Sequence, residues 1–485
     1  MSRNADVLRL PILYIGLALA RVGLIDRERA IETADLAWPR IVTGVARMSK
    51  NAADVAMVGA VLGADAIAGV GVAGPFWGLA FAIGGGVAGG TIALVSQRYG
   101  AEAYERLGLA VRSSTLLVIV VSLPVTLVFW LVPEQLVSLI NSDPTQIDYA
   151  ARYLRVVGLG IPFAGLNLVG SRVLVGADDA YTAMQVRAGG AVVNVALNAV
   201  FIVVLGWGVE GAALGTVLSN VFAVSAFALG LSRGGIPGFG SFPVEIDPVG
   251  TYVDPGTLRD LVRIGTPVGA RNLVWTVAEF PMLFFLGSYR DGTLAAFVVA
   301  RRIWGIMNTP GWGFGLAASS LSGQALGQGK EALAEAYGRD IIRYSVATYA
   351  VSAAITAVFA RPLVSLFINT DSPPATEPIA VSLIYAACVA LLFRGISGSS
   401  IGPLDASGDT RVPFLSQFLG MFCCSIPLVY LGSVTALGIW GVYLAFVAET
   451  IVPAAINYWR FNSGKWKEIS REIRPEQDDP ATTVD

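Results

Sequence analysis

Histidine is absent from this 485-residue sequence, and cysteine occurs only three times. The lack of histidine excludes an imidazole proton relay, a histidine-ligated metal site and a Ser-His-Asp catalytic triad. Cys388, Cys423 and Cys424 lie in apolar stretches, and their spacing matches neither a disulfide framework nor a metal motif. We interpret all three as buried packing residues.

Charge is scarce as well, because only 14% of the residues are charged and 54% are hydrophobic. A soluble protein of this size carries about a quarter charged residues. The charges cluster between apolar stretches of about 20 residues, the pattern typical of membrane spans. The formal net charge of −2 gives no reason to expect a nucleic-acid partner. The lipid bilayer is therefore the expected environment of the chain.

Signatures of catalytic chemistry are missing too. The sequence has no H-E-x-x-H motif, no nucleophile elbow in a plausible context and no Walker A motif. The apolar stretches carry no paired carboxylates. We therefore expect neither enzymatic activity nor ATP hydrolysis.

Twelve apolar stretches divide the chain into two halves. An N-lobe over residues 38–232 has predicted spans at 38–60, 67–97, 111–132, 153–175, 184–206 and 210–232. After a linker at 233–263, a C-lobe over residues 264–459 has predicted spans at 264–287, 294–325, 340–368, 377–403, 412–434 and 437–459. The predicted fold class is an all-α membrane protein with twelve transmembrane helices in two pseudo-symmetric six-helix lobes.

Basic residues favour one orientation of these spans. Most Lys and Arg residues fall in segments on one side of the membrane, whereas Arg152, Arg290 and Arg361 are assigned to the other side. By the positive-inside rule, both termini of this multi-pass protein are expected in the cytoplasm, with the spans in the cell membrane.

The two ends of the chain, residues 1–37 and 460–485, lie outside the predicted spans. Residues 7–24 are apolar but are interrupted by Pro11. We predict a helix at the inner membrane interface there, and a thirteenth span or a cleaved signal peptide are the alternatives. The tail after Trp466 is polar and is predicted to be disordered.

Short matches recur in the same order in both halves. Three pairs are 227 residues apart and two pairs are 230 apart. The pairs are Trp77 with Trp304, Gln97 with Gln324, Leu136 with Leu363, Leu174 with Leu404, and Gly211 with Gly441. This order indicates an internal repeat. Because each repeat has six spans, we expect a pseudo-twofold axis along the membrane normal and a cavity between the lobes.

Several of these segments carry motifs of a known family. The first span reads Asn51-Ala-Ala-Asp54-Val-Ala-Met-Val after an early Pro39, similar to an N-x-x-D-x-x-x-V pattern. Helix ends and turns later in each half read Gln97-Arg-Tyr-Gly100, Gln324-Ala-Leu-Gly327, Gly176-Ala-Asp-Asp179 and Gly408-Asp409-Thr-Arg411. In order, spacing and duplication, these motifs resemble the multidrug and toxic compound extrusion (MATE) family of prokaryotic type over residues 38–459.

The resemblance implies a function as well as a fold. Members of this family are antiporters that export organic, often cationic compounds in exchange for Na⁺ or H⁺, by alternating access. They need no cofactor besides the coupling ion, and we expect a monomer. Polysaccharide exporters of the same superfamily share the fold, so a flippase for lipid-linked saccharides is the alternative function.

Polar residues within the predicted spans are candidates for the cation site, because ionisable groups there are costly. Asn51 and Asp54 share one helix face, and Asn194 and Asn198 share another. Asp54, Asn198 and Thr216 are predicted to lie at a similar depth below the outer surface. The cation site of the resembled family carries over to Asp54, Asn194, Asn198 and Thr216.

The coupling ion stays open between Na⁺ and H⁺. Many prokaryotic relatives have Asp where this chain has Asn198, so this chain has one carboxylate fewer. Na⁺ would use the carboxylate, the two amide carbonyls and the hydroxyl, whereas a proton would need Asp54 alone. Lys50 lies one helical turn before Asp54, and a permanent ion pair between them is the competing interpretation.

Other charged residues have weaker assignments. Glu279 and Glu449 are candidates for a cavity or ion role in the C-lobe, and pairing with Arg271 or Arg301 is the alternative for Glu279. We expect a last group of arginines to snorkel or to pair with these acids. That group is Arg172, Arg301, Arg302 and Arg394.

Overall fold

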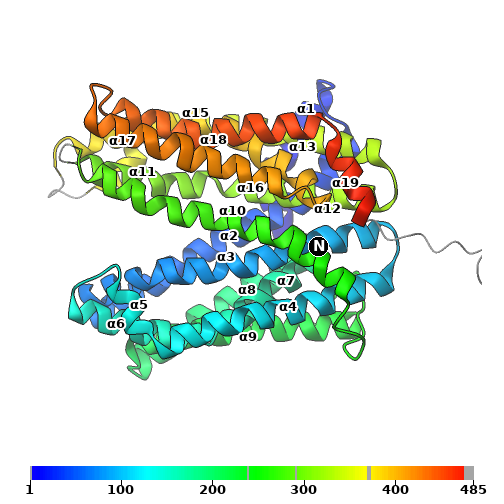
Figure 1. Ribbon diagram of the computed structural model, residues 1–485, viewed down its shortest axis with the longest axis horizontal. Coiled ribbons are helices and arrows are strands. Elements are labelled where there is room, and N and C mark those ends of the chain that lie inside the picture. The colour runs from blue at the N-terminus through cyan, green and yellow to red at the C-terminus, as the bar shows by residue number, and fades with distance from the viewer. Residues whose placement is uncertain (1–2, 238–239, 290–291, 369–372, 474–485) are drawn as a thin grey trace, which may run out of the picture.

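The computed structural model describes residues 3–237, 240–289, 292–368 and 373–473, and nearly all of them are helical. Figure 1 shows two layers of long helices that run side by side along the longest axis. One layer, the N-lobe, contains α2 (Arg27–Leu62), α3 (Ala64–Gly100), α4 (Tyr104–Leu131), α5 (Pro133–Ser138), α6 (Pro144–Gly158), α7 (Ile161–Gly176), α8 (Ala180–Asn198), the π-helical η1 (Ala199–Val204) and α9 (Gly208–Arg233).

The other layer is the C-lobe. It contains α10 (Pro255–Leu286), α11 (Thr293–Met307), α12 (Thr309–Gly327), α13 (Glu331–Val358), α14 (Ala360–Ser365), α15 (Thr376–Ala406), α16 (Arg411–Phe418), the π-helical η2 (Leu419–Ser425), α17 (Ile426–Val434) and α18 (Trp440–Asn462). Each lobe thus holds six spans at the predicted places, once α6–α7, α8–η1, α11–α12 and α16–η2–α17 are each taken as one span.

Not every one of these spans is apolar throughout. Among the described helices, eight are long and apolar enough to cross a membrane, or nine if α6 and α7, which meet at 53°, form one broken span. Neither α2 nor α10 is among them, because charged residues such as Asp54 and Arg271 interrupt their sequences. Both helices contact the opposite lobe, since α2 packs on α12 and α10 packs on α3.

Helix boundaries repeat between the lobes. The bounds of α4 and α13 are 227 residues apart at both ends, and so are those of α5 and α14. The ends of α7 and α15 are 230 residues apart. The sequence repeat therefore corresponds to a repeat of structure.

Two glutamines at equivalent positions of the repeat form hydrogen bonds between the lobes at one end of the molecule. The Gln97 side chain donates to the Ala406 carbonyl (2.6 Å), and the Gln324 side chain donates to the Gly176 carbonyl (3.2 Å). Each glutamine thus caps a helix end of the opposite lobe, as helix termini with unsatisfied carbonyls require.

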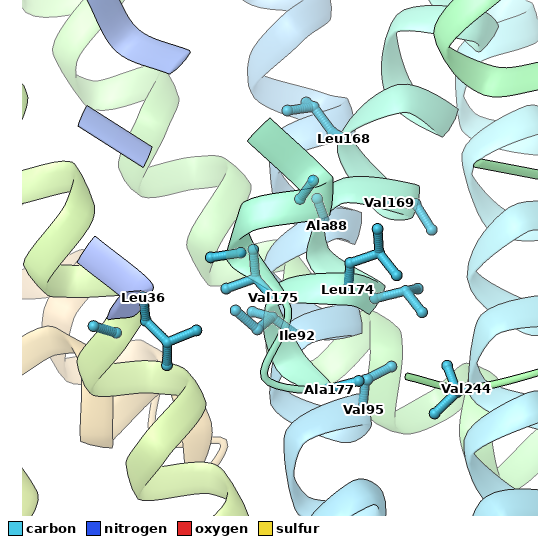
Figure 2. Packing of buried hydrophobic residues seen from close by; sticks show 14 of the residues in the cluster. Leu36, Ala88, Ile92, Val95, Leu168, Val169, Leu174, Val175, Ala177 and Val244 are labelled. Atoms are coloured by element: carbon cyan, nitrogen blue, oxygen red, sulfur yellow. The ribbon is translucent and has the colours of Figure 1, made fainter. Parts of the chain in front are cut away.

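Two glycines allow the backbones to approach at the same place. A Cβ atom at Gly100 would overlap the Gln324 carbonyl, and one at Gly327 would overlap the Gln97 carbonyl. Apolar packing continues from this contact into the N-lobe, where Figure 2 shows Val175 of α7 beside Ile92 of α3. The lobes are therefore closely packed at this end.

The linker is shorter than predicted and is itself packed. After the two-residue strands β1 (Gly235–Ile236) and β2 (Gly240–Ser241), α10 begins at Pro255, nine residues before the predicted start at 264. Asp254 caps this helix by accepting from the Thr257 amide (2.7 Å), and this hydrogen bond lowers the pKa of Asp254. The Asp-Pro pair is a helix-start signal that our sequence analysis overlooked.

Both described ends of the chain contact the N-terminal half of α13. α1 (Arg3–Arg21) packs on α2 and α13, and Arg29 at the start of α2 pairs with Asp340 (2.7 Å). The prediction of a disordered tail after Trp466 is wrong for its first part, because α19 (Lys465–Ile473) is helical and its Lys467 pairs with Glu335 (2.5 Å). Residues 474–485 lie outside the described part.

One prediction about the cysteines is also wrong. Cys388 is buried, but Cys423 in η2 is exposed and Cys424 is half-buried. In a helix of a membrane protein, an apolar stretch has a lipid-facing side, so apolar sequence alone does not imply burial.

Candidate cation site and central cavity

Asp54 lies in the N-lobe between two polar partners. Its Oδ2 atom pairs with Lys50 Nζ one turn earlier on α2 (3.0 Å), and its Oδ1 atom accepts from Asn198 Nδ2 of α8 (2.7 Å). The Asp54 and Lys50 side chains are only 19% and 17% exposed. The carboxylate is therefore held away from bulk solvent by one ammonium group and one amide.

A chain of polar side chains continues from this contact toward α9. Asn194 Oδ1 accepts from Asn198 Nδ2 (3.4 Å), and Asn194 Nδ2 donates to Thr216 Oγ1 (3.3 Å) and to Ser219 Oγ (3.4 Å). Asn194 and Asn198 are fully buried. The structure thus brings Asp54, Asn194, Asn198 and Thr216 together.

One oxygen atom in this row of polar side chains has no hydrogen-bond partner among the described residues. Asn198 Oδ1 is buried and makes no hydrogen bond to any described residue. A buried carbonyl oxygen without a donor is costly, and a cation can satisfy it. Asn198 also ends α8 just before the π-helical η1, a type of irregularity that is frequent at functional sites.

Gly215 on α9 provides the space for the Asn198 side chain. A Cβ atom at Gly215 would overlap Asn198 Oδ1, whereas a Cβ at Gly190 on α8 would make only ordinary contacts, with the nearest atom at 3.5 Å. The glycine at 215 is therefore required by the amide and not by the backbone conformation.

We expect Gly215→Ala to destabilise the protein by about 1–3 kcal/mol, because it forces a side chain into occupied space. Gly190→Ala is the matched control on the facing helix and should be neutral or slightly stabilising, because Ala favours helix over Gly by about 1 kcal/mol. Thermal unfolding of both purified variants measures the difference. Equal stability of the two would show that the Asn198 amide is not fixed in this position.

The other residues predicted for the site are not part of this hydrogen-bonded row of side chains. Asn51 is exposed and makes no hydrogen bond to another described residue, so the structure does not join it to Asp54. Glu449 is buried and forms two hydrogen bonds with Arg301 (2.7 and 2.6 Å). Glu279 is exposed at the central cavity and pairs with neither Arg271 nor Arg301 within the described part of the chain.

No group of three or more acidic or cysteine side chains that could hold a metal ion occurs among the described residues. The Asp54 site has a single carboxylate, with amide and hydroxyl oxygens around it. Such a donor set suits a weakly held monovalent ion or a proton and not a structural divalent metal.

A cavity of about 660 Å³ lies between the lobes. It is lined by α2, α3 and α7 of the N-lobe and by α10, α11, α12 and α15 of the C-lobe. Its volume is in the range of sites for drug-sized ligands. Three tryptophans, Trp275, Trp304 and Trp312, contribute apolar surface to its wall.

Arginines are the main charged groups of this cavity. The six that line it are Arg40, Arg47, Arg172, Arg271, Arg301 and Arg394. Arg40 and Arg47 were not among the candidates predicted from the sequence, although both lie in the predicted span 38–60. The expectation for Arg301 is confirmed by the Glu449 pair, but Arg172 pairs with no acid in the described structure.

A family model named MatE matches residues 39–200 and 267–431, which is most of both lobes. The chain belongs to the MatE family. This MatE protein is 23% identical over 445 residues to the probable multidrug resistance protein YoeA of Bacillus subtilis, covering 90% of this chain and 94% of that one. It is 25% identical to the multidrug resistance protein NorM of Burkholderia vietnamiensis, with coverage of 90% and 94%.

Solved structures confirm the fold. A MOP superfamily transporter from Pyrococcus furiosus, described by the reverse polarity of its binding pocket, superposes with a TM-score of 0.84 at 22% identity. An outward-facing multidrug resistance MATE transporter superposes with a TM-score of 0.81, also at 22% identity. Each covers 91% of this chain and is itself covered to 96%. The MatE protein is thus a multi-pass membrane transporter with the twelve-helix fold and not an enzyme.

Proposed function

We propose that this MatE transporter is a cation-coupled antiporter that exports organic compounds by alternating access. The partly buried Asp54 carboxylate, with the unpartnered Asn198 carbonyl oxygen beside it, is the observation that supports the proposal most directly. An intramembrane carboxylate in such surroundings is a group that can bind Na⁺ or H⁺ and release it.

Helix α2 provides the connection between the two functions. It carries Asp54 and Lys50 at the cation site and Arg40 and Arg47 at the cavity. Asp54 follows Arg47 by seven residues, or about 10 Å along a helix. A cation that changes the position of α2 therefore also changes the cavity wall, which is the physical requirement for coupling two sites.

The packing of the lobes supports alternating access. The two glutamine contacts and the close glycine approach hold the lobes together at the end where residues 97–100 and 324–327 lie. We place this end in the cytoplasm, together with both termini, from the distribution of basic residues. Breaking these contacts while the outer ends close would expose the cavity to the other side.

The Lys50 ammonium group stands where an exchanged cation would bind. Both are attracted to the same carboxylate, so binding of the cation requires Lys50 to leave Asp54. In this view the ion pair is the empty state of the site, whereas the competing interpretation makes it permanent.

Lys50→Met separates these interpretations. We expect the variant to fold normally and to need about fivefold less coupling cation for half-maximal export, since a partly exposed ion pair is worth about 1 kcal/mol. The measurement is export from proteoliposomes against cation concentration, with thermal unfolding in parallel. A loss of stability as large as that of Asp54→Asn would instead favour a permanent ion pair.

A flippase for lipid-linked saccharides is a second candidate function. The arginine-lined cavity favours it, because guanidinium groups bind phosphates well. Proteoliposomes that contain a fluorescent prenyl-diphosphate sugar would test it, since movement of this lipid between leaflets without any cation gradient would support the flippase.

A further inference from the structure

The central cavity carries an excess of positive charge that the transport function alone does not explain. Of its six arginines, Arg271 pairs with Asp405 through two hydrogen bonds (3.0 and 2.7 Å). Arg301 pairs with Glu449 in the same way. These two arginines are neutralised by buried acids, and they account for only part of the charge.

The other four have no acidic partner within the described part of the chain. Arg394 donates to the neutral Asn308 side chain (3.0 Å) and lies over the Trp275 ring. Arg40 and Arg47 both lie over the Trp312 ring, with their guanidinium carbons 5.5 and 4.8 Å from its centre. Arg172 forms no hydrogen bond or ion pair to a described residue.

Several of their nitrogens are both buried and unsatisfied. Arg40 Nε and Nη1 and Arg172 Nη1 have no hydrogen-bond partner among the described residues. Nη1 of Arg187 on α8, whose charge repels that of Arg40, has none either. Removing a guanidinium nitrogen from water without a partner is costly, and four like charges also repel one another. A protein keeps such an arrangement when something else supplies the negative charge.

We propose that this cavity binds an organic anion, with its carboxylate, sulfonate or phosphate on Arg40, Arg47 and Arg172 and its apolar or aromatic body against the indole rings. Among the described residues that line the cavity, four guanidinium groups lack an acidic partner, whereas Glu279 is the one carboxylate without a basic partner. The field therefore repels the organic cations that the family resemblance led us to expect. The inference rests on the proposed export function, because it names the substrate class of that transporter.

The charge of the substrate decides how much net charge each cycle of cation-coupled export moves across the membrane. Exchange of an outgoing cation for one incoming monovalent cation moves no net charge. Exchange of an outgoing anion for the same cation moves at least two positive charges inward per cycle. An inside-negative potential of 100 mV raises the equilibrium constant for inward movement of each such charge by about 50-fold. The resting potential itself would therefore drive export.

Binding to purified protein tests the substrate class without requiring transport. Fluorescein and rhodamine 123 share one xanthene ring system but are an anion and a cation at pH 7.5, so their difference isolates charge. Fluorescence polarisation in nanodiscs should show fluorescein binding at least tenfold more tightly than rhodamine 123. Farnesyl diphosphate as a competitor distinguishes a lipid-like source of the anion from a soluble one. If its inhibition constant is below the Kd of fluorescein, the lipid diphosphate is the source, and if it is above, a soluble anion is.

Arg172→Gln tests the assignment of the anion to the arginines. We expect it to weaken fluorescein binding about 10- to 100-fold, the effect of losing a hydrogen bond to a charged group. It should also raise the thermal stability of the empty protein, because an unpaired buried charge is removed. A merely structural arginine would give the opposite change in stability. Arg302→Gln is the matched control, since Arg302 is exposed and does not line the cavity.

Tighter binding of rhodamine 123 than of fluorescein would overturn the proposal, and so would unchanged fluorescein binding in Arg172→Gln. Failure of gradient-driven export with intact anion binding would instead count against the proposed antiport and leave the substrate class standing.

Discussion

Protein that carries Asp54→Asn should fold and bind substrate but show no response of export to a cation gradient. The variant removes the charge that must hold the cation and then release it, whereas the amide is easier to bury than the carboxylate. Export rates in proteoliposomes should become equal with and without the gradient. This is the largest functional effect that we expect from a single substitution.

Asp65→Asn is the matched control for this experiment. Asp65 lies in the first turn of α3, is exposed and forms no ion pair to a described residue. Its loss changes the charge of the protein by the same amount at a place without a polar network. Wild-type coupling in the Asp54→Asn protein, with normal folding, would show that another group binds the cation.

The largest effect on stability is expected from Glu449→Gln. The Glu449 side chain is 0% exposed and neutralises Arg301 through two hydrogen bonds. Breaking a buried pair by removing one partner typically costs about 3–5 kcal/mol, because the other charge is left uncompensated. Thermal or denaturant unfolding of the purified variant measures this loss.

A double variant shows whether the stranded charge is the cause. Arg301→Met combined with Glu449→Leu removes both charges and should recover most of the lost stability, since apolar residues of similar volume often replace buried pairs without cost. If Glu449→Gln is as stable as the wild type, the pair is not formed in the membrane.

The fold followed from the sequence because the membrane imposes simple rules on it. Every predicted span contains one helix or two to three consecutive helical segments, and the 227-residue repeat reappears in the bounds of α4 and α13. Apolar length and the duplication of short motifs are local signals, and they need no knowledge of packing. The start of α10 was missed because its signal, Asp254 before Pro255, lies outside the apolar stretch.

The cation site was predictable in part. Helical periodicity put Asn194 and Asn198 on one face, and depth matched Asn198 to Asp54 and Thr216. Hydrogen bonds of the two asparagines connect these residues in the structure. The space left by Gly215 and the free Asn198 oxygen depend on the contact between α8 and α9, which sequence does not give.

The charge of the cavity was not predictable by the same reasoning. Whether an arginine in a span is paired depends on partners far away in sequence: Glu449 is 148 residues from Arg301, and Asp405 is 134 residues from Arg271. Because those acids pair with Arg301 and Arg271, the other four arginines of the cavity have no acidic partner in the described structure. This follows from the packing of the two lobes and not from the sequence. A span with several arginines on one helix, such as Arg40 and Arg47 on α2, was the signal that could have pointed to the cavity.

Reciprocal exchange is the most direct test of cation-coupled antiport. The protein is reconstituted in liposomes with whichever of fluorescein or rhodamine 123 it binds, and dye and cation movements are recorded together. We predict that an inward gradient of Na⁺ or H⁺ drives the dye outward and that an outward dye gradient drives the same cation inward, both absent in Asp54→Asn. If the wild-type protein moves the dye at the same rate with and without a gradient of either cation, cation-coupled antiport is contradicted.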